Sequence, residues 1–348
     1  MPLSQVPIPQ APRVSVICAA WNGERFIGQT LDAFKAQDEP NFEVIVVDDA
    51  STDTTPQLLA SIDDPRFRII RNATNLRVIE SRNIAVRAAR APFIAVTDQD
   101  DPSQRSRLRL QANYLDQHPK ASAVATLIRS IDSDGNLRRG VSDWSFSGEE
   151  ARAAFVFHNF LSHSTLMFRR QYAPEPVYPP EQAYCEDYRL LVALADQGEG
   201  IHVIRKKLVD YRYHDTNHTH VVRSDMAQAS RQIRLELLAR MDVLPTDAQW
   251  RLHQGFEGSP AAINASVHRE SGLWLTHLIN ANRRSAYVER AAFERVCAYK
   301  WLELTHRFSG LGRVCWAQFK KGPVSALSQM PALWPSIANL FRKTCLKA

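Results

Sequence analysis

Predicted strands alternate with predicted helices along the first hundred residues, and this alternation permits few architectures. The strands are short, apolar and partly β-branched runs at 14–18, 42–47, 66–70 and 91–96. The intervening segments carry apolar residues at helical spacing and occupy 24–35, 54–62 and 78–89. Strands that alternate with helices form βαβ units and a parallel sheet. We therefore predict an α/β fold with a mainly parallel sheet flanked by helices.

Three carboxylates follow the fourth predicted strand, in the stretch Thr97-Asp98-Gln99-Asp100-Asp101-Pro102. If the strand continues, Asp98 and Asp100 point to the same side of the sheet, because side chains alternate with a period of two. Two carboxylates held together are costly unless a cation lies between them, and oxygen ligands suit Mg²⁺ or Mn²⁺. The alternative is helix capping, since Asp followed by Pro is common at a helix start.

The loops after the first two predicted strands carry further polar and aromatic residues, Trp21-Asn22 and Asp48-Asp49. Ligands of parallel sheets bind beyond the carboxyl ends of the strands, where these loops meet. An aromatic ring to stack a base, an acid for its N–H edge and a metal for phosphates suggest a nucleotide. Neither G-x-G-x-x-G nor G-x-x-x-x-G-K-[ST] follows the first strand, so the nucleotide must be held by other means.

Composition indicates a globular chain, with 348 residues of which 45% are apolar and 23% charged. This length allows one large α/β domain and a smaller appendage. The five cysteines are scattered and lack C-x-x-C spacing, so we expect reduced thiols and a cytoplasmic address. We expect neither a signal peptide nor a membrane-spanning segment, and residues 1–13 are predicted to form a flexible arm.

The net charge of +6 is concentrated at the C-terminal end, where 301–348 hold seven Lys or Arg and one Glu. Because the remainder is nearly neutral, we do not expect nucleic-acid binding. Segment 336–347 places Ile337, Leu340, Phe341 and Cys345 on one face, behind Trp334. A basic amphipathic helix of this kind docks on an anionic membrane surface, which would make the protein peripheral on the inner face of the cell membrane. Docking on its own domain is the alternative.

Several blocks resemble motifs of family 2 glycosyltransferases and occur in that family's order. The opening 14–23 (VSVICAAWNG) is similar to V-S-V-I-I-P-x-Y-N-G, and 43–55 (EVIVVDDASTDTT) to E-I-I-V-V-D-D-G-S-T-D-x-T. Three further blocks, 75–83, 97–102 and 164–170, resemble in turn N-x-G-x-x-x-A-R-N, D-x-D-D-x-x-x-P and S-x-x-M-F-R-R. The last two blocks, 185–188 and 211–214, resemble E-D-Y and Y-R-x-H. The resemblance covers roughly residues 14–219.

This resemblance implies a GT-A catalytic domain at 14–222, followed by a helical region at 223–348 with the basic tail. It implies transfer of a sugar from a nucleotide-diphosphate donor to an acceptor hydroxyl, with inversion at the anomeric carbon, and we expect the donor to be a UDP-sugar. The implied cofactor is Mn²⁺ or Mg²⁺, and the implied partners are the donor and a glycan or lipid-linked acceptor. The expected role is synthesis of a surface polysaccharide or glycolipid.

The resemblance also assigns residues. Asp187 would be the catalytic base, Asp100 the metal ligand with Asp98 beside it, and Glu186 and Tyr188 would face the acceptor. The donor-binding residues would be Ala19, Trp21, Asn22, Asp49, Arg82, Asp98, Gln99 and Arg212. We expect His214 as a second metal ligand, although Arg212 and His214 can also be a solubilising pair at a strand end. His218 and His220 lack a Cys or acidic partner at zinc-binding spacing.

Three positions depart from the family pattern. Ala19 stands where Pro or Thr is usual, Trp21 where Tyr is usual, and Arg77 where Gly is usual. Because none of these positions is an expected metal ligand or the expected base, we expect the departures to affect the nucleotide that is bound more than the activity.

Two other functions compete with glycosyl transfer. A nucleotidyltransferase also uses an α/β sheet and paired aspartates, but no Gly-rich loop with a following Arg and Lys succeeds the first strand. A non-catalytic membrane-associated module with the same fold is the second alternative, and the intact set of Asp98, Asp100 and Asp187 argues against it.

Overall fold

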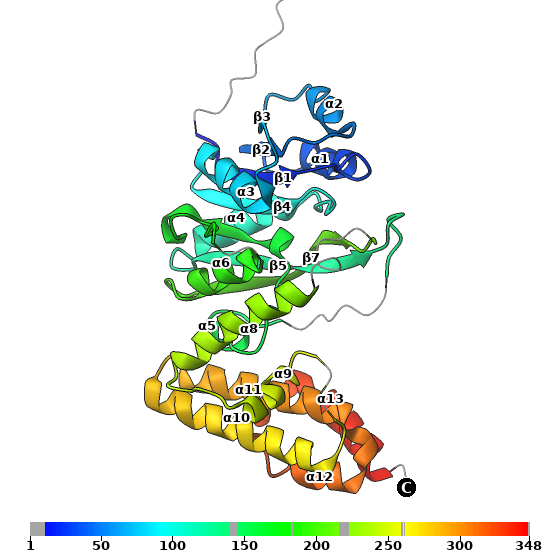
Figure 1. The fold of residues 1–348 in the computed structure, drawn as a ribbon, viewed down its shortest axis with the longest axis vertical. Coiled ribbons are helices and arrows are strands. Elements are labelled where there is room, and N and C mark those ends of the chain that lie inside the picture. Colours follow the sequence, from blue (N-terminus) through cyan, green and yellow to red (C-terminus); the bar gives the residue numbers. More distant parts are fainter. Residues whose placement is uncertain are drawn as a thin grey trace, which may run out of the picture. The chain divides into compact units, whose positions relative to one another are not determined.

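The computed structural model describes residues 11–138, 145–181, 184–215, 223–258, 260 and 262–346. Most of the predicted arm, His218, His220 and Lys347 lie outside these residues. The chain divides into two compact units (Figure 1). Unit 1 comprises Met1–Gly148 and Leu161–Ala229, and unit 2 comprises Glu149–Phe160 and Ser230–Ala348.

Unit 1 is built on a seven-stranded sheet of order β3-β2-β1-β4-β6-β5-β7, which can be followed down unit 1 in Figure 1. The strands are β1 Val14–Ala20, β2 Phe42–Asp48, β3 Phe67–Arg71, β4 Phe93–Asp98, β5 Ala123–Ile131, β6 Met167–Arg169 and β7 Ile201–Arg212. Strands β1 to β4 pair in parallel, as do β5 and β7, and β6 alone among these seven is antiparallel to its neighbours. The predicted α/β fold with a mainly parallel sheet is confirmed.

Helices cover both faces of the parallel half of the sheet. In unit 1 they are α1 Ile27–Lys35, α2 Thr55–Ala60, α3 Arg77–Ala88, α4 Arg107–Gln117 and α6 Glu186–Ala195. Apolar side chains of α1 and α4 form one core with alternate residues of β1, β2 and β4. Helix α3 contacts β1 and β2 but contributes nothing to that core, so it covers the opposite face. Burial on both faces explains why these strands are continuously apolar.

Two elements differ from their predicted limits for identifiable reasons. Helix α1 begins at Ile27 instead of residue 24, because Phe26 has φ −127° and lies outside the helical range, so that residues 24–26 form a turn. The sequence pattern predicts a strand from Leu208 to Tyr213, but β7 begins at Ile201, seven residues earlier. Its stretch Arg205-Lys206-Lys207 is exposed and lies opposite a register shift in β5, so it lacks the apolar pattern of a buried strand.

Unit 2 is helical, with α5 Glu149–Phe155, α9 Asp247–Gln254, α10 Ala265–Ser285, α11 Arg290–Arg307, α12 Arg313–Phe319 and α13 Trp334–Phe341. Helix α8 (Arg223–Ala239) begins in unit 1 and continues in unit 2. Helix α5 packs on α11, where Glu150 pairs with Arg295 at 2.6 Å. The predicted catalytic region 14–222 includes α5, whereas the contacts of α5 assign it to unit 2.

The C-terminal helix is shorter than predicted: α13 ends at Phe341, and a π-helical turn follows at Arg342–Leu346. Leu333 and Leu340 are buried within unit 2, so one face of α13 docks on its own unit. Within the described ranges, no helix is both long and apolar enough to cross a membrane. None of the five cysteines, all of which are described, forms a disulfide.

The turn between α6 and β7 provides a test of this fold. Gly198 has φ +54°, and an added Cβ would lie 2.1 Å from the carbonyl oxygen of Lys120. We expect Gly198→Ala to lower the free energy of unfolding by about 2–4 kcal/mol, because left-handed strain and a backbone clash act together.

Urea denaturation measures this change, with Gly28→Ala as the matched control. Gly28 lies within α1, and its Cβ would meet nothing within 4 Å. Alanine there should be neutral or stabilise by about 0.5–1 kcal/mol. Equal stabilities of the two variants would contradict the described turn.

Candidate active site

The carboxyl ends of β1, β2 and β4 lie side by side. Ala19 pairs with Asp98 across β1 and β4, and Ala20 pairs with Asp48 across β1 and β2. The loops that begin with Trp21 and Asp49 and the turn after Asp98 therefore meet at one edge. This arrangement follows from parallel pairing, in which strands with equal registers end together.

The turn after β4 brings Asp98 and Asp100 together, although not by strand alternation. Strand β4 ends at Asp98, and Asp100 lies in the turn beyond it. Burial, and next the negative charge of Asp98, raise the pKa of Asp100 above its usual value. The two carboxylates therefore lie within electrostatic reach, as the sequence suggested, but a turn instead of a strand brings them there.

His214 approaches Asp100 from the end of β7. Its Nε2 lies 2.7 Å from Asp100 Oδ2, and its ring packs 4.8 Å from the ring of Phe26, measured between centroids. The hydrogen bond to His214 opposes the rise in the pKa of Asp100. The structure thus joins two predicted metal ligands from residues 114 positions apart.

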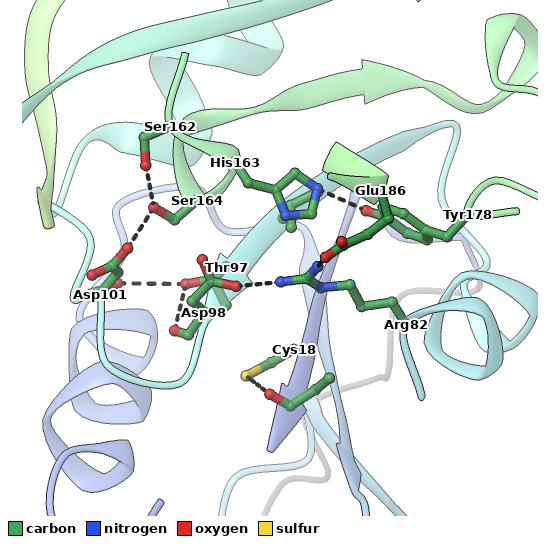
Figure 2. Close-up of polar contacts among 12 residues, drawn as sticks. Cys18, Arg82, Thr97, Asp98, Asp101, Ser162, His163, Ser164, Tyr178 and Glu186 are labelled. Atoms are coloured by element: carbon green, nitrogen blue, oxygen red, sulfur yellow. Dashed lines mark hydrogen bonds and ion pairs between the residues drawn. The ribbon is translucent and has the colours of Figure 1, made fainter. Parts of the chain in front are cut away.

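Asp101 connects the turn after β4 to two distant segments through hydrogen bonds. Its Oδ2 accepts a hydrogen bond from Ser164 Oγ at 2.6 Å (Figure 2). Its Oδ1 accepts one from the backbone N–H of Arg212 at 3.0 Å. Burial, and then the charges of Asp100 and Asp98, raise the pKa of Asp101 well above its usual value. This carboxyl ties the β4 turn to β7 and faces the interior.

Arg82, from α3, connects the two halves of the site. Its Nη2 donates to Asp98 Oδ1 at 2.7 Å and its Nη1 to Glu186 Oε1 at 2.5 Å (Figure 2). Burial tends to raise the pKa of Asp98, but the charge of Arg82, its hydrogen bond and other nearby charges together outweigh burial and hold that pKa below the usual value. The guanidinium also lies 5.8 Å from the ring centroid of Tyr178. One side chain therefore fixes the end of β4 relative to the start of α6.

Asp187 follows Glu186 in the first turn of α6. Burial, and then the charge of Glu186, raise the pKa of Asp187 to about 7. A carboxylate with a pKa near neutrality can both accept and release a proton at physiological pH. Tyr188, predicted to face the acceptor, has a buried side chain.

The predicted nucleotide side contains one prominent exposed ring, Trp21, which is 53% exposed. Gln99 holds the Trp21 backbone through two reciprocal bonds: Trp21 N–H donates to Gln99 Oε1, and Gln99 Nε2 donates to the Trp21 carbonyl. Asp49 Oδ1 accepts from Asn72 Nδ2 and from the backbone N–H of Leu76. The structure thus places the predicted stacking ring and the predicted acid on adjacent loops.

Asn22 and Arg212 hold the loops that follow β1, β2 and β4 in place. Asn22 adopts φ +46°, and its Oδ1 accepts from the backbone N–H of Thr52, which joins the first two loops. The guanidinium of Arg212 is buried and donates to Gln29 Oε1 and to the backbone carbonyls of Asp100, Asp132 and Ser133. These contacts orient the β4 turn, and a donor-binding role for Arg212 stays a prediction.

Sequence reasoning missed the contribution of Tyr178. Its backbone N–H and carbonyl bond the side-chain amide of Asn83 at 3.0 and 2.7 Å, and its hydroxyl lies 3.0 Å from His163 Nε2. Burial lowers the pKa of His163 to about 3, so the ring is neutral. The asparagine of the predicted A-R-N block was the available signal, but its partner lies 95 residues away.

The residues suited to a cation are Asp100 and His214, with Asp98 adjacent. Within the described part of the chain, no group of three or more His, Cys, Asp or Glu side chains is arranged to hold a metal ion. A divalent cation here would need further ligands from phosphate oxygens and water, which is the usual way that Mg²⁺ is held.

Comparison with known proteins gives consistent matches. Residues 15–175 match the family model described as Glycosyl transferase family 2. Uncharacterized protein Rv1520 of Mycobacterium tuberculosis is 31% identical over 206 residues, which are 58% of this chain and 59% of that relative, so the match spans about three fifths of its length. Succinoglycan biosynthesis protein ExoO of Rhizobium meliloti is 34% identical over 47% of this chain and 46% of its own length.

Among solved structures, residues 1–349 of S. aureus TarS, in complex with UDP-GlcNAc, superpose with a TM-score of 0.54. The superposition covers 91% of this chain and 92% of the TarS fragment, at 18% sequence identity. At this identity the match shows a shared fold.

The Arg82 bridge yields a stability prediction. Arg82→Ala leaves the Asp98 and Glu186 carboxylates without their shared cation, and we expect a loss of about 2–3 kcal/mol in the free energy of unfolding at pH 7. The loss should shrink as the pH falls below about 4, because Asp98 contributes stability only while it is ionised.

Arg87→Ala is the matched control for thermal or urea unfolding across pH. Arg87 lies on the same helix and forms an exposed pair with Glu80 at 2.6 Å, so its loss should cost at most about 1 kcal/mol at any pH. A pH-independent effect of Arg82→Ala, or one no larger than that of Arg87→Ala, would contradict the described bridge.

Proposed function

We propose that this chain, which carries a family 2 glycosyltransferase domain with the GT-A fold, transfers a sugar from a nucleotide-diphosphate donor to an acceptor hydroxyl with inversion. The predicted family is confirmed. One observation carries the proposed reaction: Asp187, with a pKa of about 7, lies in the first turn of α6, which the Arg82–Glu186 ion pair joins to the end of β4. The bridge thereby holds the proposed base in a fixed position relative to the end of β4, where the donor is proposed to bind.

The proposed donor is a UDP-sugar. Trp21 offers an exposed ring on which a base can stack, and Asp49 lies on the neighbouring loop, directly after the end of β2. The TarS fragment, which shares the fold, was solved with UDP-GlcNAc and with UDP. These observations favour a uridine nucleotide and leave the sugar to experiment.

The side chains of this site fit a Mn²⁺ or Mg²⁺ ion whose coordination is completed by the nucleotide-sugar donor. Asp100 and His214 would hold it, and Asp98 would lie beside it. Burial and the charge of Asp98 oppose ionisation of Asp100, so a cation would relieve repulsion that the protein alone only partly offsets. When bound, the ion neutralises charge that develops on the leaving diphosphate.

The proposed transfer is a single displacement. Asp187 accepts the proton of the acceptor hydroxyl while the hydroxyl oxygen forms a bond to the anomeric carbon. The bond from that carbon to the diphosphate oxygen breaks. The nucleoside diphosphate leaves with the bonding electron pair. Attack opposite to the leaving group inverts the carbon and needs no covalent intermediate on the protein.

The proposed acceptor is a hydroxyl of a growing surface polysaccharide or glycolipid. The relative ExoO is described as a succinoglycan biosynthesis protein, which supports a polysaccharide role for this chain.

Incubation with a panel of nucleotide sugars, with and without Mn²⁺, tests the proposed function. Release of a nucleoside diphosphate supports glycosyl transfer, release of pyrophosphate from a nucleoside triphosphate and a sugar phosphate would indicate a nucleotidyltransferase, and no turnover with any donor would indicate a non-catalytic module.

Asp187→Asn should lower kcat by the ~10²–10⁴ expected for loss of a general base, with donor affinity near that of wild type. Asp196→Asn, at the opposite end of α6, is the matched control and should retain activity. Steady-state kinetics and calorimetric titration of UDP measure both quantities. An equal fall in donor affinity and turnover would instead make Asp187 a donor ligand or a structural residue.

The pH profile gives a second readout of the same assignment. Because Asp187 must be ionised to accept a proton and its pKa is about 7, kcat/KM should rise with pH and level off above pH 7. The residual activity of Asp187→Asn should lack this limb. A wild-type profile that is flat from pH 5 to about 8 would exclude a base of this pKa.

Asp100→Asn should remove the gain in UDP affinity that Mn²⁺ gives to wild type, a gain that we expect to be at least about tenfold. The physical reason is the loss of one anionic ligand beside His214. Calorimetry with and without Mn²⁺ tests this, with the exposed Asp63→Asn as control. Undiminished Mn²⁺ dependence in Asp100→Asn would remove the site.

A further inference from the structure

The last part of unit 2 carries cations without acidic partners. Residues 304–348 contain seven Lys or Arg and no Asp or Glu. Five of these cations are exposed and make no ion pair with any described residue: Arg313, Lys320, Lys321, Arg342 and Lys343. An unneutralised group of this size attracts polyanionic surfaces.

Helix α13 has two apolar faces, of which unit 2 covers one. Leu333 and Leu340, seven residues apart, are buried in the unit. Trp334 and Phe341 are also seven residues apart and lie on the adjoining stripe, yet they are 60% and 39% exposed. A helix that only packed on its own unit would present polar residues on the outer stripe.

The exposed stripe continues onto a neighbouring helix. The ring of Phe341 meets that of Trp316 of α12 edge-on, with centroids 5.3 Å apart. Arg313, three residues before Trp316 and therefore on the same side of α12, is exposed. The turn that holds Arg342 and Lys343 contacts both α12 and α13. Apolar and basic side chains therefore share one local surface.

We propose that this surface, formed by Arg313, Trp334, Phe341, Arg342 and Lys343, docks on an anionic lipid bilayer. Charge complementarity draws it to acidic headgroups, and the exposed rings enter the interface, where tryptophan and phenylalanine are favoured. A free polyanion such as RNA would use the cations but would leave Trp334 and Phe341 without an apolar partner. The inference is independent of the proposed sugar transfer.

Co-sedimentation of the full chain with vesicles tests the proposal. We expect binding to phosphatidylcholine vesicles that contain phosphatidylglycerol and at least tenfold weaker binding to phosphatidylcholine alone. Trp334→Ala should weaken binding to the anionic vesicles several-fold, whereas Leu244→Ala, which removes a leucine that is 86% exposed elsewhere in unit 2, should bind as wild type does.

A second variant separates charge from apolar insertion and guards against misfolding of the first. Arg342→Glu with Lys343→Glu should abolish the preference for anionic vesicles, and circular dichroism should confirm the fold of each variant. Equal binding of wild type and Trp334→Ala, or equal binding to neutral and anionic vesicles, would overturn the proposal. Tight binding to single-stranded RNA that Trp334→Ala leaves intact, without vesicle binding, would also overturn it.

Discussion

The site depends on one buried guanidinium. Arg82 spans from the last residue of β4 to the first turn of α6, and these carboxylates come from positions 16 and 104 residues away. The planar fork of arginine can bond two carboxylates at once, which a lysine ammonium does with less geometric definition. Without this cation, Asp98 and Glu186 would repel each other in a partly desolvated site. The position of the end of β4 relative to the start of α6 therefore rests on this pair of bonds.

Around that bridge, similar carboxyl groups acquire different properties. Arg82 holds the pKa of Asp98 down, whereas burial raises the pKa of Asp101 and of Asp187. Asp101 is used for structure, bonded to Ser164 and to the end of β7. Environment, and not residue type, separates a charged edge, a structural acid and a candidate base.

Backbone strain concentrates in the same loops. Six non-glycine residues within the described ranges have positive φ, and four of them border the site: Asn22, Ala50, Arg77 and Cys185. A left-handed conformation costs roughly 1 kcal/mol for such residues, and it persists when surrounding contacts determine it. At Asn22 that support is visible, because its side chain accepts a hydrogen bond from the second loop. The loop geometry at the strand ends therefore lowers the free energy of unfolding.

The sequence by itself determined the alternating strands and helices, the edge where their loops meet, and the resemblance to family 2 glycosyltransferases. These features are local: apolar periodicity and short motifs carry them, and parallel pairing then brings the strand ends together. Only the tertiary structure decided that Asp101 turns inward, that Arg212 bonds backbone carbonyls, that α5 packs in unit 2 and that α13 leaves a second apolar stripe exposed. Each of these depends on a partner far along the chain or on which face a neighbour covers. Periodicity reports that a face is apolar, but burial and ionisation depend on what packs against it.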